Sequence, residues 1–270
     1  AVGEAEVHPE HDMAINPGQV FGEISGIKTQ DPAFGLPATW IEQDAKENAQ
    51  TLGYTVVDAN TVIATHLSQL LNENAPQLLG HEEVQQLLDR LATTAPKLIE
   101  DLVPKLLPLS TLVKVLQNLL YESIPVRDFK TIIECLAEYA PLTQDAGILT
   151  SHVRVALGRF IVQHINGLGN ELSVITLEPS LEQLLHQSIQ MSEDGGGIEP
   201  GLAERIHQSL AESAQTQEMN GSPAILLVSN QVRGMLMRFV KHTIPNMHVL
   251  AYNEVPDNMQ IKIVSTVGQG

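Results

Sequence analysis

Residues 80–141 alternate apolar and polar positions with the period of an amphipathic α-helix. Apolar side chains recur at spacings of three and four, which places one apolar stripe along each helix. The clearest sets are Val84, Leu87, Leu88 and Leu91, then Leu112, Leu116 and Leu119, and then Phe129, Ile132, Ile133 and Leu136. The pattern therefore predicts a module of short helices that pack through one face.

Prolines divide this module, because proline lacks an amide donor and disfavours helix in the residue before it. They stand at Pro96, Pro104, Pro108, Pro125 and Pro141. We expect Pro125 to open the helix that contains Phe129, with Asp128 in its first turn, where a carboxylate complements the helix dipole.

The segment before the module mixes strands and helices. Its pattern predicts the end of a strand at 1–7, glycine- and proline-rich turns at 15–36, and strands at 38–41 and 54–57. Helices are expected at 42–52, ended by Gly53, and at 61–72, capped by Asp58 or Asn60.

The segment after the module alternates in the same way. We expect one long helix at 148–165, with Val153 and Ile161 on its apolar face and Arg154 and Arg159 elsewhere. Strands are predicted at 172–177, 224–228, 248–251 and 260–267, and helices at 179–191, 200–217 and 232–242, with a flexible break at Gly195–Gly197. Because strands alternate with helices, a partly parallel sheet with crossover helices follows. The predicted fold class is mixed α/β, with two α/β parts joined by a central all-helical module.

Composition and charge narrow the function classes. The chain has 270 residues, and its 15 basic and 32 acidic side chains give a formal net charge of −17. Such a surface should repel nucleic acids and anionic lipid. The lone Cys135 permits no intrachain disulfide, and its helical position favours a small buried residue over a nucleophile. There is no run of ~18 apolar residues that would predict a membrane span, and residues 1–6 lack the features of a secretory signal.

Catalytic patterns are weak. The buried strand at 224–228 is followed by Ser229-Asn230-Gln231, without the glycines that a phosphate-binding loop needs. His8, His11 and Asp12 are residue types that could bind a metal ion. Because Pro9 lies between the histidines, their spacing is not that of a helix face, and we expect a solvated loop instead. We therefore expect no enzyme, no cofactor and no metal. A nucleotide- or metal-dependent enzyme built on the C-terminal part is the alternative.

Apolar residues in the glycine-rich segment suggest a surface instead. Ile15, Pro17, Phe34 and Leu36, together with Val57, Val62 and Thr65, could line a shallow apolar depression with Asp31 at its rim. Pattern alone favours the other interpretation, in which these residues form the core of a small subdomain. Both interpretations stay open on the residues alone.

A set of motifs spread over nearly the whole chain carries a family resemblance. They are Asp31–Leu36, Gly53–Asp58, Thr61–His66, Gln85–Arg90, Glu100–Pro104, Lys114–Leu120, Arg127-Asp128, Ala140-Pro141, Val153–Arg159 and Glu199–Ala203. Together they resemble the cytoplasmic domain of the FlhA family of flagellar export-gate proteins. Virulence type III secretion export gates are close relatives, and the contexts of Asp31–Leu36 and Ala140-Pro141 favour the flagellar branch.

The resemblance implies a domain organisation. A membrane-embedded N-terminal half would precede a cytoplasmic domain of four subdomains at the bacterial inner membrane, and the copies would form a nonameric ring. On this basis residues 1–9 and 59–79 are a remnant of the first subdomain, truncated at its start. Residues 10–58 are an inserted small α/β subdomain, 80–158 the helical subdomain and 159–270 the C-terminal α/β subdomain.

The resemblance also implies partners. The family docks export chaperones carrying filament-type substrates on an apolar dimple between the first two subdomains, and it contacts components of the export ATPase complex. Asp31, Phe34 and Thr65 match the most telling dimple positions. Ile15, Pro17, Leu36, Val57 and Val62 match its supporting wall, so the resemblance favours the binding surface over the core.

Overall fold

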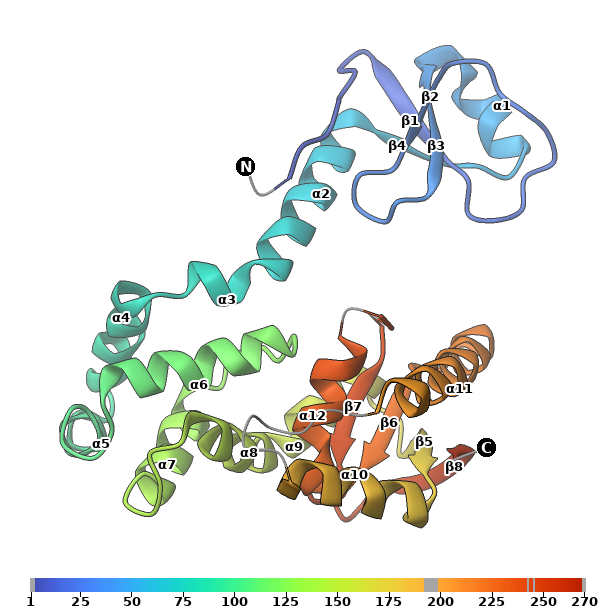
Figure 1. The fold of residues 1–270 in the computed structure, drawn as a ribbon. Coiled ribbons are helices and arrows are strands. Elements are labelled where there is room, and N and C mark those ends of the chain that lie inside the picture. The colour runs from blue at the N-terminus through green and yellow to red at the C-terminus, as the bar shows by residue number, and fades with distance from the viewer. Residues whose placement is uncertain (1–2, 192–198, 242, 245, 269–270) are drawn as a thin grey trace. The chain divides into compact units, whose positions relative to one another are not determined.

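The computed structural model describes residues 3–191, 199–241, 243–244 and 246–268, and the Gly195–Gly197 break lies outside them (Figure 1). The chain forms two compact units, residues 1–78 and 79–270. The boundary falls beside position 80, where the helical module was expected to begin. The finer division into four parts stays a prediction.

Unit 1 (residues 1–78) is built on a four-stranded antiparallel sheet in the order β2-β3-β1-β4. Its elements are β1 (His11–Ile15), β2 (Ile27–Gln30), β3 (Pro37–Glu42), β4 (Thr55–Asp58), η1 (Gln43–Ala45), α1 (Lys46–Thr51), α2 (Ala59–Glu73) and α3 (Ala75–Leu78). The side chain of Asp58 accepts a hydrogen bond from the Thr61 amide at 2.9 Å, which confirms the predicted cap of α2.

Three expectations for unit 1 are wrong. Residues 3–10 form no strand, and β1 begins at His11 instead. Asp12 is not in a solvated loop, because it is buried in β1 and paired with Lys46 at 3.4 Å. The turns at 15–36 contain β2, whose exposed residues at the sheet edge leave no apolar alternation to read.

Unit 1 has one small hydrophobic cluster on each face of its sheet. Met13, Trp40 and Val62 pack together where α2 crosses the sheet, while Ala14, Ile41 and Ala49 pack on the α1 face. The alternation of Met13 and Ala14 between the two clusters follows from the two-residue period of a strand.

Unit 2 (residues 79–270) opens with the predicted helical module. Its helices are α4 (His81–Ala92), α5 (Pro96–Leu102), α6 (Leu109–Tyr121), α7 (Phe129–Tyr139), α8 (Ala146–Ala156) and α9 (Gly158–Asn166). The predicted apolar stripes face inward, as Val84, Leu116 and Ile132 show by their complete burial.

Two helix boundaries differ from the prediction. Helix α7 begins at Phe129 rather than Pro125, because the side chain of Asp128 accepts a hydrogen bond from the Thr131 amide and so caps it there. The helix expected at 148–165 is broken at Leu157 into α8 and α9. The apolar face continues across the break, since Val153 and Ile161 are both buried, so the pattern could not reveal it.

The C-terminal part of unit 2 has a parallel four-stranded sheet in the order β7-β6-β5-β8. Its elements are β5 (Glu171–Leu177), α10 (Pro179–Met191), α11 (Pro200–Met219), β6 (Ile225–Val228), α12 (Asn230–Val240), β7 (His248–Ala251), η2 (Tyr252–Glu254) and β8 (Gln260–Val267). This arrangement confirms the mixed α/β class, and the fully buried β6 is a central strand as predicted.

Strands β5, β6 and β7 of the unit 2 sheet are covered on both faces, whereas the edge strand β8 is largely exposed. Leu172, Ile225 and Leu250 join the core of the helical module, while Ile175 and Leu226 pack against α10, α11 and α12. The helical module and the C-terminal sheet therefore share one hydrophobic core. Within the described ranges, no helix combines the length and apolar character needed to cross a membrane.

Candidate functional site

The loop between β2 and β3 holds Asp31, Phe34 and Leu36 in a fixed turn. The Asp31 amide donates to the Leu36 carbonyl and the Gly35 amide to the Asp31 carbonyl, each at 2.8 Å. The Phe34 amide donates to Oδ2 of Asp31 at 2.7 Å, and Gly35 adopts a φ of 67°. These bonds restrict the loop and set the direction in which its side chains leave it.

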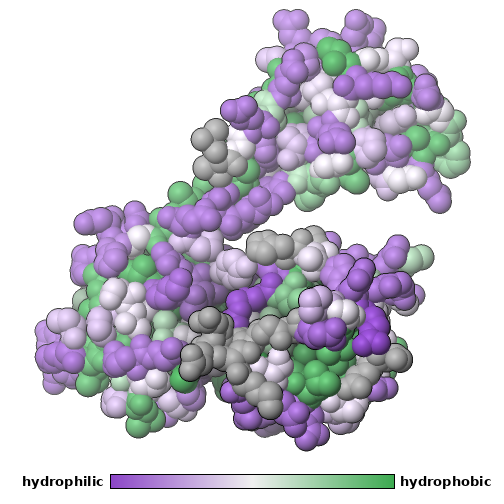
Figure 2. All heavy atoms as spheres, in the orientation of Figure 1, coloured by the Kyte–Doolittle hydropathy of each residue, from purple (hydrophilic) through white to green (hydrophobic). Residues whose placement is uncertain are grey.

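The turn separates its residues by exposure. Asp31 is only 4% exposed, so it lies inside the loop rather than at a rim as we expected. Phe34 is 70% exposed and Leu36 is 39% exposed. Figure 2 shows that apolar side chains reach the visible surface of unit 1 among hydrophilic ones. An exposed phenylalanine on a hydrogen-bonded turn is therefore available to a partner.

The remaining predicted residues support this loop to different degrees. Ile15 and Val57 pack against the cluster around Trp40, to which the buried Val62 also belongs. Ile15 lies opposite Ala38, two positions beyond Leu36, so the strand register brings this cluster next to the loop. Thr65 is half-buried on α2 one turn after Val62, and Pro17 is exposed after β1.

Unit 1 contains one pocket that the predicted residues do not line. A pocket of about 520 Å³ is lined by residues that include Val20, Ile24, Lys28 and Tyr54, and by none of the eight predicted residues. Of the eight residues, three are exposed (Pro17, Phe34 and Leu36), four are partly or fully buried (Ile15, Val57, Val62 and Thr65), and Asp31 is the buried anchor of the loop. That these eight residues line one depression stays a prediction.

A buried cluster of four charges in unit 2 was missed by the sequence interpretation. The Arg154 guanidinium donates to both carboxylate oxygens of Glu254 at 2.6 Å, to Glu122 at 2.7 Å and to the Val249 carbonyl at 3.2 Å. Arg233 donates to both oxygens of Glu122 at 2.5 and 3.1 Å. Arg154, which we placed off the apolar face, is instead 2% exposed.

The cluster joins elements far apart in the sequence. Glu122 is the C-cap of α6, Arg154 lies on α8, Arg233 on α12 and Glu254 in η2. Burial would lower the pKa of Arg154, but hydrogen bonds to Glu254 and the charges of Glu122 and Glu254 raise it above its ordinary value. Arg154 shares a helix face with Thr150, four positions earlier, and both are buried, but a threonine at that spacing does not mark a buried face in the sequence.

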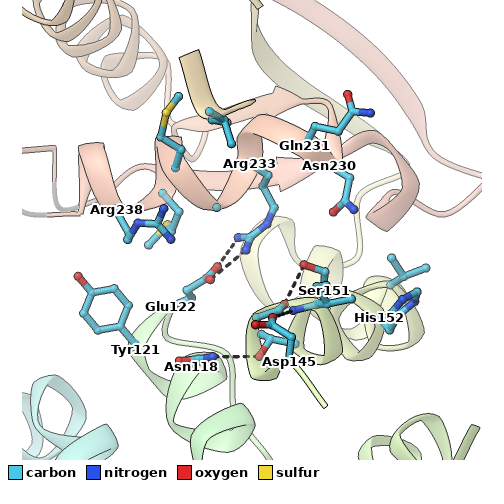
Figure 3. A pocket seen from close by; sticks show the side chains of 18 of the residues that line it. Asn118, Tyr121, Glu122, Asp145, Ser151, His152, Asn230, Gln231, Arg233 and Arg238 are labelled. Carbon is cyan, nitrogen blue, oxygen red and sulfur yellow. Dashed lines mark hydrogen bonds and ion pairs between the residues drawn. The ribbon is translucent and has the colours of Figure 1, made fainter. Parts of the chain in front are cut away.

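A pocket of about 660 Å³ lies beside this cluster and is shown in Figure 3. Arg233 points from α12 toward Glu122, and Asn230 points into the space between α12 and α8, whereas Gln231 points away. Among the described residues no three metal-ligating side chains come together, in this pocket or elsewhere.

Comparison with protein families gives one match over almost the whole chain. The model of the FHIPEP family matches residues 1–260. The flagellar biosynthesis protein FlhA of Yersinia enterocolitica is 49% identical over 267 residues, which are 99% of this chain and 38% of that protein. FlhA of Bacillus subtilis is 35% identical over 268 residues, or 98% of this chain and 40% of that protein. The chain thus spans about two fifths of these relatives.

Solved structures share the fold. The Chlamydia pneumoniae CdsV protein in complex with CdsO matches with a TM-score of 0.80 and 24% identity, over 97% of this chain and 76% of that chain. The nonameric SctV-C of EPEC matches with a TM-score of 0.76 and 24% identity, over 96% of this chain and 78% of that chain. From the family match and the FlhA relatives together, the chain belongs to the FHIPEP family.

Proposed function

We propose that this chain is the cytoplasmic part of a flagellar type III protein export gate and docks export chaperones that carry filament-type substrates. The observation that carries the proposal is Phe34, which is 70% exposed on a turn fixed by Asp31. Full burial of a phenylalanine is worth about 1.5–3 kcal/mol. A partner that covers Phe34 would therefore gain about 10- to 150-fold in affinity.

The flagellar assignment is supported by the degree of similarity. Relatives named flagellar biosynthesis protein FlhA are 35–49% identical to this chain, whereas the SctV and CdsV structures are 24% identical. The virulence branch is the alternative within the same family. Chaperones from a flagellar and a virulence system, compared on the same chain, would separate the two.

We further propose that the whole protein assembles into a ring at the inner membrane and contacts an export ATPase component. The support comes from fold relatives, one determined as a nonamer and another in complex with CdsO. Concentration-dependent sedimentation of this chain and of the full-length protein tests the ring. Sedimentation as a monomer at every concentration by both would contradict it.

A nucleotide-dependent enzyme is the competing function, and one contact counts against it. At the carboxyl end of β6 the Ser229 amide, at the start of α12, donates to Oε1 of Glu182 at 2.5 Å. A phosphate would use such an amide at a helix N-terminus, and the Glu182 carboxylate would repel it. Calorimetry with nucleotides and divalent metals tests this, and a micromolar signal would favour the enzyme.

The docking proposal is tested by Phe34→Ala, Asp31→Ala and Thr65→Ala. Phe34→Ala should weaken binding of a flagellar chaperone with its cargo at least tenfold, while thermal melting changes little because the ring is exposed. Asp31→Ala should weaken binding by loosening the turn. The matched control is Phe21→Ala, since Phe21 is 86% exposed in the same unit but was not predicted to dock. Undiminished binding by all three variants would overturn the proposal.

A further inference from the structure

Gly234 occupies a position in α12 that the chain itself does not explain. It lies inside the helix, where glycine is less stable than alanine by roughly 0.5–1 kcal/mol. A Cβ atom added there would meet no atom within 4 Å, so packing within the chain does not require glycine. Glycine allows another backbone to approach closely. The open space therefore suits a partner from outside.

That space belongs to the pocket of about 660 Å³ between α12 and α8. The α8 wall presents Ile148, Ser151 and Val155, which lie on one helix face that is turned away from the core. Ile148 is 52% exposed and Val155 is 39% exposed. Met235 and Met237 of α12 also line the pocket but are largely buried, at 7% and 6% exposed. One wall thus offers apolar contacts, and the other offers a bare backbone.

Polar groups at the pocket suit the main chain of a ligand. Asn230 points into the space in Figure 3, and Asn253 also lines the pocket. Within the described part of the chain, neither side-chain amide has a hydrogen-bond partner. An amide side chain both donates and accepts, which matches the unpaired N–H and C=O groups of an extended peptide. A helix would already have satisfied those groups internally.

The charges at the pocket select an acidic ligand. Glu122 and Arg233 neutralise one another, whereas the Asp145 carboxylate, which accepts a hydrogen bond from the Ile148 amide at 2.8 Å, keeps its negative charge. Lys114 and Arg238 also line the pocket and form no ion pair with any described residue. On a chain whose net charge is −17, these two cations make the pocket a local site of positive charge.

We propose that this pocket binds an extended segment of another protein in which acidic and apolar residues alternate. The segment passes close to Gly234, places apolar side chains against Ile148 and Val155, and places carboxylates near Lys114 and Arg238. This surface is separate from the Phe34 loop and does not depend on chaperone docking.

The test measures fluorescence anisotropy with the 270-residue chain and two labelled ten-residue peptides, one alternating leucine with glutamate and one alternating leucine with lysine. The glutamate peptide should bind at least tenfold more tightly, and less tightly as salt rises. Gly234→Trp should weaken its binding at least tenfold by filling the space, whereas the control Leu168→Trp, at an exposed position in the same unit, should not.

The charge-reversed variant Lys114→Glu with Arg238→Glu keeps the test decisive if Gly234→Trp fails to fold. It should reverse the preference toward the lysine peptide. Equal binding of both peptides, no saturable binding below millimolar concentration, or unchanged glutamate-peptide binding in the charge-reversed variant would overturn the proposal. Chaperone binding should be unaffected by Gly234→Trp, so failure of this proposal is distinguishable from failure of the docking function.

Discussion

Glu254→Gln should destabilise unit 2 strongly, because it removes one of two carboxylates that neutralise two buried arginines. The Glu254 side chain is fully buried and accepts two hydrogen bonds from Arg154 at 2.6 Å. Its Oε1 atom also lies 3.8 Å from Nε of Arg233, which has no hydrogen-bond partner. After the change, Glu122 alone would face both guanidinium groups.

The magnitude follows from this imbalance. Breaking a buried ion pair by removing one partner typically costs about 3–5 kcal/mol, because a charge is left buried without compensation. The glutamine amide has nearly the same volume as the carboxylate, so cavity formation adds little. For a unit of this size, about 2–4 °C of melting temperature is lost per kcal/mol, so a fall of about 6–20 °C is expected.

The assay is calorimetric melting of the 270-residue chain with two comparison variants. Glu171→Gln breaks the exposed pair with Lys262 at 3.2 Å and should cost at most about 1 kcal/mol. The double variant Arg154→Met with Glu254→Leu removes opposite charges together and should recover much of the loss, since the Glu122–Arg233 pair stays balanced. A free energy of unfolding for Glu254→Gln within about 1 kcal/mol of that of the parent chain would refute the reasoning.

Three further predictions address other parts of unit 2. Burial and the charges of neighbouring groups lower the pKa of His248 below 6.5, so His248 binds a proton at higher pH in the unfolded chain than in the folded chain. The free energy of unfolding should therefore fall as pH drops below 6.5, and His248→Gln should reduce that fall in melts at a series of pH values. Burial raises the pKa of Cys135 to about 11 from 9.0, so alkylation at pH 8 should be at least about 100-fold slower in the folded than in the unfolded chain; comparable rates would contradict this. Gly158→Ala would place its Cβ against the Glu254 carbonyl oxygen and should cost about 1–3 kcal/mol, whereas Gly234→Ala meets open space and should stabilise by up to about 1 kcal/mol; equal melting of the two variants would show that this contact relaxes freely.

Periodicity predicted the elements whose burial is one-sided or continuous. The stripes of α4, α6 and α7 and the apolar run of β6 correspond to complete burial of Val84, Leu116, Ile132 and Leu226. The same reasoning missed β2, because its edge position leaves polar residues exposed on both faces. It also missed the start of β1, where the buried Asp12 is compensated by Lys46, a partner distant in sequence.

The candidate sites show the same limit. Motif resemblance selected Phe34, and the loop that exposes it is a local structure. The charge cluster joins Glu122 to Arg233 across 111 positions, and no local pattern encodes such a contact. The space at Gly234 likewise exists only once α8 and α12 pack near one another. Contacts between segments distant in sequence could be identified only from the folded structure.

We propose above all that a chaperone with its cargo covers the apolar side chains of the β2–β3 loop. Hydrogen–deuterium exchange of the chain, with and without a purified flagellar chaperone–cargo complex, tests it most directly. We predict slower exchange in residues 31–36 and in α2 near Thr65 on binding, with no change around the exposed Phe21. Binding that leaves exchange in residues 31–36 unchanged would contradict the account.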